Sequence, residues 1–264
     1  MKFYKISNGI VNVAGSISND SIKKIIDDNG HFKVKFGKVD GAFDCSHCKS
    51  LTSLEGAPKE VGGDFECYAC DNITSLKGAP QKVDGNFECF LCHNLTSLKG
   101  APKEVCGNFN CNDCYNLTSS EGAPQKVGGN FDCRDCKNFT SLKGAPKQVG
   151  GDFICSDCPN LTSLKGAPQK VGSNFICSTC KLTSLEGAPQ KVDGDFKCHG
   201  CYNLTSLEGA PQKVDGDFNC SSCGSLTSLK GAPQKVDGDF KCRYCPKSIV
   251  KQAIDLYGER KVAF

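Results

Sequence analysis

Hydrophobic positions recur along most of the chain in a frame of 22 residues. The motif Phe-x-Cys-x-x-Cys occurs ten times, and its first cysteines run from Cys45 to Cys242. One step, between Cys177 and Cys198, is 21 residues long. Most units continue with Leu-Thr-Ser-Leu and then Gly-Ala-Pro. Repetition of this strictness predicts a solenoid in which each unit buries its apolar side against its neighbours.

Within one unit the pattern changes from alternating to irregular. Phe65 and Cys67 alternate with polar or variable residues, which is the period of a strand. Gly78 and Pro80 stand in the second half of the same unit, where they prevent a regular helix. We therefore expect one short parallel strand per unit, a turn, and an irregular return.

The segment before the repeats has a mixed pattern. Residues 3–17 alternate weakly and predict strand, residues 20–28 predict a helix, and residues 31–39 predict a returning strand. Asn19 or Asp20 would N-cap this helix, and Asn29-Gly30 would end it. A small α/β N-terminal cap is the expected result.

A second helix is expected after the last repeat. Apolar residues from Ile249 to Tyr257 fall on one helical face within Ser248–Tyr257, and Gly258 follows. A solenoid needs covers at its ends, because the terminal units otherwise expose core. The predicted organisation is an N-terminal cap over 1–38, ten repeats over 39–245, and a C-terminal capping helix within 246–264.

The repeat unit resembles the leucine-rich repeat, whose pattern is L-x-x-L-x-L-x-x-N/C-x-L over 20–29 residues. Phe65, Cys67, Cys70, Ile73 and Leu76 occupy the corresponding positions, with Phe and Cys in place of the two strand leucines. The short unit has one residue fewer after its second cysteine, as in the shorter variant of that pattern. The resemblance covers residues 39–245 and implies a leucine-rich-repeat horseshoe or a β-solenoid with an irregular convex side.

The cysteine content then needs an explanation. The chain has 264 residues and 21 cysteines, 20 of which belong to the ten motifs, and Cys106 is left over. The start of the chain has no apolar signal region, and no run of 18 apolar residues is present. These features favour the cytoplasm, where disulfides are rare.

Three roles for the paired cysteines stay open. Two successive Cys-x-x-Cys pairs have the spacing of a zinc ribbon, and His47, His93 and His199 could add ligands. Disulfides are a second possibility. The third is a buried ladder of neutral thiols, because free Cys behaves as a small hydrophobic residue. The ladder also accounts for the ten matched phenylalanines, so we expect no cofactor and treat zinc as the alternative.

Charge argues against a nucleic-acid binder. The net charge is +3, and it comes from the two ends. Residues 42–245 carry 21 Lys and Arg against 23 Asp and Glu. A nucleic-acid binder usually presents a continuous basic stripe.

Comparison of the repeats with each other separates constant from variable positions. The residue before each first cysteine and the residue after it both vary, and on a strand both would point outward. Stacked, they form two columns on the strand face, the usual concave binding surface of a solenoid. Tyrosines on the adjoining turn edge complete the candidate surface. The expected partner-binding residues are Glu66, Tyr68, Glu88, Phe90, Leu91, Asn110, Tyr115, Asp132, Arg134, Ile154, Ile176, Lys197, His199, Tyr202, Lys241, Arg243 and Tyr244.

No catalytic constellation is recognisable in the sequence. The chain lacks a Gly-rich phosphate loop, a paired-carboxylate pocket and a Ser/His/Asp set, and Cys106 has no recurring base beside it. We therefore expect a non-enzymatic protein-binding solenoid without membrane association. The Leu-Thr-Ser-Leu-x-Gly-Ala-Pro unit also resembles repeat proteins of phages and bacteria, which implies an inhibitor of a host protein, such as a defence nuclease. The alternative is a zinc-binding adaptor for nucleic acid or protein.

Overall fold

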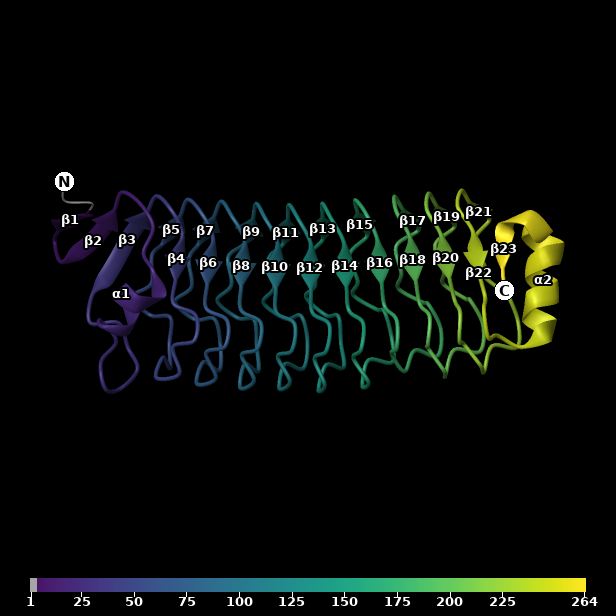
Figure 1. Ribbon diagram of the computed structural model, residues 1–264, viewed down its shortest axis with the longest axis horizontal. Helices are drawn as coiled ribbons and strands as arrows, with labels where there is room; N and C mark the ends of the chain where they lie inside the picture. Colours follow the sequence, from purple (N-terminus) through teal and green to yellow (C-terminus); the bar gives the residue numbers. More distant parts are fainter. Residues whose placement is uncertain (1–3) are drawn as a thin grey trace.

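A computed structural model describes residues 4–264, so the start of the expected strand at residue 3 lies outside the described residues. The chain winds into a parallel β-solenoid with a period of about 22 residues and little helix (Figure 1). Each coil contributes two strands of two residues each, and equivalent strands pair in register from coil to coil.

The first row of strands contains the phenylalanines, and we call it the Phe row. It forms an eleven-stranded sheet that also includes the C-terminal strand. Its strands are β4 (Phe43–Asp44), β6 (Phe65–Glu66), β8 (Phe87–Glu88), β10 (Phe109–Asn110), β12 (Phe131–Asp132), β14 (Phe153–Ile154), β16 (Phe175–Ile176), β18 (Phe196–Lys197), β20 (Phe218–Asn219), β22 (Phe240–Lys241) and β23 (Val262–Ala263).

A second row, the Val row, precedes the Phe row in each coil and is separated from it by a three-residue turn. The expectation of one strand per unit was therefore wrong. A two-residue strand shows no alternation, so the single buried valine of each unit did not reveal it. The row comprises β5 (Glu60–Val61), β7 (Lys82–Val83), β9 (Glu104–Val105), β11 (Lys126–Val127), β13 (Gln148–Val149), β15 (Lys170–Val171), β17 (Lys191–Val192), β19 (Lys213–Val214) and β21 (Lys235–Val236).

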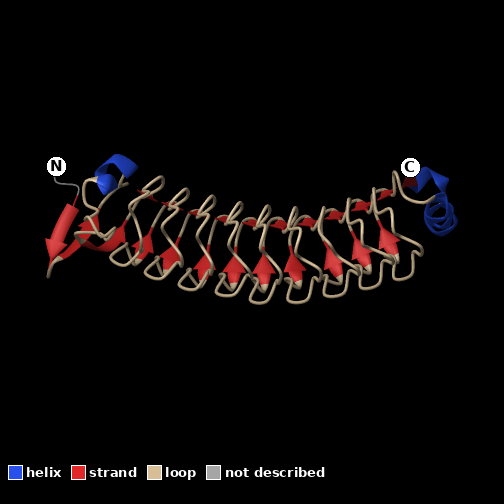
Figure 2. Ribbon diagram, turned by 90° about the horizontal axis from the view of Figure 1, so that it is seen from below, coloured by secondary structure: helices blue, strands red, loops and turns tan. Residues whose placement is uncertain are grey.

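The Val row is interrupted once. One sheet ends at β15 and another begins at β17, whereas β16 and β18 of the Phe row still pair. The interruption coincides with the 21-residue unit, which has one residue fewer after Cys180. Figure 1 shows the wider spacing between β15 and β17. The stack is gently bowed, with the Val row on the outer side of the bend and the Phe row on the inner side (Figure 2).

The core is a set of side-chain columns that run along the solenoid. The phenylalanine rings from Phe43 to Phe240 stack with centroids 5.1–5.6 Å apart, and Tyr257 continues the stack 4.7 Å from Phe240. Columns of buried cysteine, leucine and valine lie beside it. Burial of one Phe or Leu side chain contributes about 1.5–3 kcal/mol, so each coil adds a similar increment of stability.

Glycine of the Gly-Ala-Pro segment turns the chain back toward the Val row. Gly78 has φ +91°, and a Cβ at this position would lie 2.4 Å from the backbone nitrogen of Glu55 in the preceding coil. Only glycine fits this combination of left-handed backbone and close approach.

The N-terminal segment differs from the expectation in detail. β1 (Tyr4–Ser7) and β2 (Ile10–Val13) form an antiparallel hairpin, and β3 (Lys35–Val39) joins the Val row. The helix α1 covers only Asn19–Lys23, and its N-cap is Ser18 instead of Asn19 or Asp20. It ends early because Ile26 forms an antiparallel bridge with Phe32.

At the other end the expected helix is present as α2 (Lys247–Tyr257), with Gly258 after it and a short 3-10 helix η1 (Glu259–Lys261). The Tyr257 hydroxyl donates a hydrogen bond to the carbonyl oxygen of Pro233 at 2.6 Å. Lys261 Nζ donates to the carbonyl oxygen of Val236 at 2.9 Å. These bonds satisfy carbonyl groups of the last coil that no further coil could reach.

Candidate functional site: the inner face of the Phe row

The cysteine pairs lie inside the solenoid. Of the 21 cysteines, 19 are buried, Cys245 is half-buried and Cys106 is exposed. All are free thiols. Among residues 4–264, no three or more His, Cys, Asp or Glu side chains are grouped as a metal ion requires.

The second cysteine of nine of the ten pairs has a specific hydrogen-bonding role. Cys70 Sγ donates to the backbone carbonyl oxygen of Cys45, in the preceding coil, at 3.2 Å. Equivalent bonds of 3.1–3.4 Å follow in eight further coils up to Cys245 and Cys220. Burial raises the pKa of most of these thiols, for example of Cys92 to about 12. Such thiols keep the proton that makes them donors, whereas a metal would need the thiolate. Cys245 differs, because a hydrogen bond from the Cys220 thiol lowers its pKa to about 7.

The Asp and Asn residues that directly precede the repeat phenylalanines form a second hydrogen-bond ladder, which was not expected from the sequence. Asn86 N–H donates to Asp64 Oδ1 at 2.7 Å, and Asn108 N–H donates to Asn86 Oδ1 at 2.8 Å. The series continues to Asp239 with distances of 2.7–2.9 Å. The signal was available, because Asp or Asn occupies this position in nine of the ten units.

The turn within each Cys pair is left-handed. Ten residues in the second position between the cysteines have positive φ, from His47 (50°) to Gly200 (69°), and they include Leu91 (55°) and Tyr244 (59°). A left-handed residue bends the chain sharply at the end of the strand. Leu91 therefore belongs to the turn edge beside the strand face, as does the exposed Tyr244.

The variable residues of the Phe row line the inner side of the bend. Most are half-buried, because neighbouring coils about 4.8 Å away flank each side chain. Asp132 and Ile154 are exceptions: their exposed fractions are 6% and 9%, so these two contribute less surface than expected. Asp132 is covered by Arg134, whose guanidinium forms an ion pair with it. The other expected residues on this row lie at its surface: Glu66, Glu88, Asn110, Ile176, Lys197 and Lys241.

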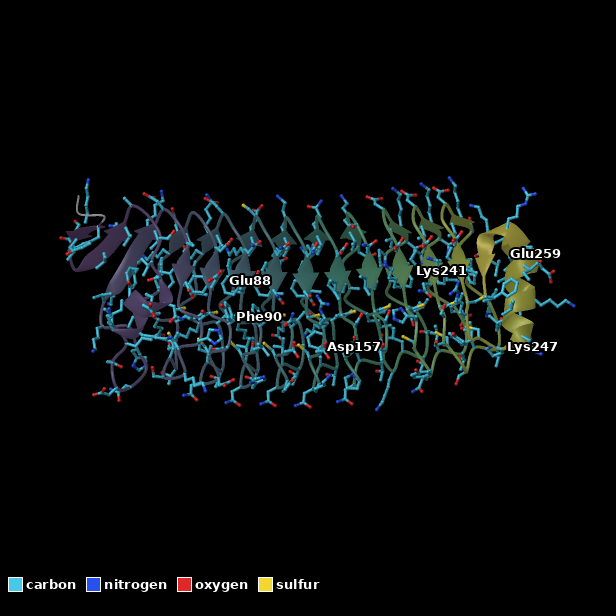
Figure 3. All side chains as sticks on the ribbon, viewed as in Figure 1. Glu88, Phe90, Asp157, Lys241, Lys247 and Glu259 are labelled. Carbon is cyan, nitrogen blue, oxygen red and sulfur yellow. The ribbon has the colours of Figure 1, made fainter. Side chains whose placement is uncertain are left out.

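Aromatic side chains gather at the N-terminal half of this face. The Tyr68 and Phe90 rings stack with centroids 4.4 Å apart and an interplanar angle of 6°. His47 meets the edge of Tyr68 at 5.0 Å. Both stacked rings are half-buried and lie outside the phenylalanine core column. Figure 3 labels Phe90 close to Glu88 in this half and Lys241 in the C-terminal half.

The turn edge carries the remaining expected residues. Tyr115, Tyr202 and Tyr244 are 40%, 63% and 87% exposed. His93 tilts against Tyr115 at 4.8 Å and pairs with Asp71 at 2.7 Å. His199 Nδ1 lies 2.8 Å from the Ser178 hydroxyl, and Arg243 is exposed at the last coil.

No protein-family model, curated protein or solved structure matches the chain. No helix among residues 4–264 is long and apolar enough to cross a membrane.

Proposed function

We propose that this protein is a non-enzymatic binding protein that holds a protein partner on the inner face of the Phe row. The observation that carries the proposal is the half-buried stack of Tyr68 on Phe90, which lies outside the core. Both rings occupy positions that the core does not use, where other units have Ser, Asn, Arg or His. Aromatic side chains on a rigid surface are common anchors of protein interfaces.

The arrangement of the repeats supports the same proposal. The core columns barely change from coil to coil, whereas the inner-face residues differ in charge and size. Such a scaffold holds many side chains in fixed positions, so little conformational entropy is lost on binding. The inner side of a bowed stack also fits a convex partner surface.

A finer hypothesis follows from the repeat resemblance. We propose that the protein acts in the cytoplasm as a leucine-rich-repeat type inhibitor of a host protein, such as a defence nuclease, as the resemblance to phage and bacterial repeat proteins implies. This part rests on analogy of repeat sequence and not on the geometry of the site.

Affinity capture from native host cells tests the proposal. The variant Tyr68→Asp/Phe90→Asp should lose the captured partner. The control Gln81→Asp/Gln125→Asp introduces the same charge at exposed positions just before the Val row and should keep it. Retention of the partner by the folded inner-face variant would contradict the proposal.

A further inference from the structure

The charges on the inner face are paired unevenly. In the C-terminal half, Lys197 Nζ lies 3.0 Å from Asp195 Oδ2, and Lys241 Nζ lies 2.5 Å from Asp217 Oδ2. In the centre Arg134 is paired with Asp132. Most cations of the face are thus already neutralised by carboxylates of the same chain.

The carboxylates of the N-terminal half lack such partners. Across the part of the chain that the structure describes, no lysine, arginine or histidine forms an ion pair with Asp44, Glu66 or Glu88. Glu66 pairs in register with Asp44 on one side and with Glu88 on the other, so three carboxylates follow one another at strand spacing.

This arrangement disfavours the ionised forms of the Glu66 and Glu88 carboxyl groups. Burial, followed by the neighbouring carboxylates Asp44 and Asp64, raises the pKa of Glu66. Burial also raises the pKa of Glu88, although a hydrogen bond from Asn110 opposes the shift. A cation placed against these groups would relieve the repulsion, so the free protein is prepared for a positively charged partner.

The aromatic stack stands beside the same carboxylates. Glu66 and Tyr68 are two residues apart in one coil, and Glu88 and Phe90 are two residues apart in the next. We call Asp44, Glu66, Tyr68, Glu88 and Phe90 the acidic–aromatic patch. A guanidinium group suits such a surface, because it can stack on an aromatic ring and donate two parallel hydrogen bonds to a carboxylate.

We propose that the acidic–aromatic patch binds arginine side chains on a basic surface of the protein partner. This inference rests on the proposed function and specifies the partner's chemistry. The lysines at the C-terminal half add little opposing charge, because each already has an aspartate partner. Phosphate groups of a nucleic acid would meet unpaired carboxylates and be repelled.

Fluorescence anisotropy with labelled octa-arginine, octa-lysine and octa-glutamate peptides, at about 0.1 M salt, tests the inference. The wild-type protein should bind octa-arginine about fivefold tighter than octa-lysine and should not bind octa-glutamate. Glu66→Gln/Glu88→Gln should weaken octa-arginine binding about tenfold. Tyr68→Ser/Phe90→Ser should abolish the preference for arginine, so that octa-arginine and octa-lysine bind with about equal affinity.

The matched control is Glu60→Gln/Glu104→Gln, which removes the same charge from exposed positions of the Val row. It should change octa-arginine binding by less than about twofold. The inference would be overturned if Glu66→Gln/Glu88→Gln and the control Glu60→Gln/Glu104→Gln weakened octa-arginine binding equally. Equal affinities of the wild-type protein for octa-arginine and octa-lysine, or binding of octa-glutamate, would also overturn it.

The proposed function can survive that failure. Tyr68→Asp/Phe90→Asp could abolish capture of the partner while Glu66→Gln/Glu88→Gln leaves the affinity for octa-arginine unchanged. In that case the inner face binds a partner that is not recognised through arginine. If neither variant changes its respective readout, the proposed function and the inference both fail.

Discussion

Cys136 Sγ donates a hydrogen bond to the backbone carbonyl oxygen of Cys111, 3.3 Å away in the preceding coil. The two cysteines are completely buried, yet they have different structural roles. Cys111 fills space, whereas Cys136 both fills space and satisfies a carbonyl group that the strand pairing leaves free. This relationship explains why a thiol, and not leucine, occupies the second position in the nine pairs that make the bond.

The first prediction compares Cys136→Ala with Cys111→Ala. Both substitutions remove the same buried volume, but only Cys136→Ala leaves the Cys111 carbonyl without its donor. We expect Cys136→Ala to cost about 1 kcal/mol more in unfolding free energy, measured by urea denaturation. Equal losses would show that the thiol acts only as packing.

The second prediction concerns Ser120, which interrupts the leucine column between Leu98 and Leu142. Its hydroxyl is buried and has no hydrogen-bond partner. Ser120→Leu should add about 1–3 kcal/mol of stability, and Ser120→Ala about 1 kcal/mol. Thermal unfolding checks both, and a lower midpoint for the leucine variant would mean that the neighbouring coils have closed over the site.

The third prediction tests the ladder before the phenylalanines. Asn108 Oδ1 accepts the Asn130 N–H at 2.8 Å. Asn108→Ala should lower the unfolding free energy by about 1–2 kcal/mol, because the half-buried N–H loses its acceptor. Asn108→Asp keeps an acceptor, as Asp152 does in its own coil, and should change the stability by less than about 0.5 kcal/mol. A loss as large for Asp as for Ala would argue against the ladder.

The fourth prediction is a pH dependence. The pKa values of Glu66 and Glu88 are raised above the ordinary value of 4.5 in the folded protein. Well below 4.5 both groups are protonated in the folded and the unfolded states, and stability is lost as the pH rises from the unfolded value through the raised folded values. Glu66→Gln/Glu88→Gln should therefore unfold at a higher temperature than wild type at pH 7. The difference should shrink as the pH falls and vanish by about pH 3, and a constant difference across this range would refute the sign of the shift.

The repeat register and the inward position of both cysteines could be predicted, because Phe-x-Cys alternation recurs ten times. The Val row could not, since a two-residue strand carries no period. Helix α1 ends before residue 28, where the chain instead forms a local antiparallel bridge between Ile26 and Phe32. The inner-face columns followed from alternation alone. The effective charge of these columns could not be predicted from the sequence, because ion pairs such as Lys241 with Asp217 join residues 24 positions apart.

The paired cysteines decide between a solenoid with a core of neutral thiols and a metal-dependent adaptor, because zinc would need them as thiolates. The direct measurement is zinc content per chain in natively purified protein, combined with thermal unfolding in the presence and absence of a chelator. We expect less than about 0.2 zinc per chain and the same unfolding midpoint with chelator. About two or more zinc per chain, with a midpoint lowered by the chelator, would contradict the account.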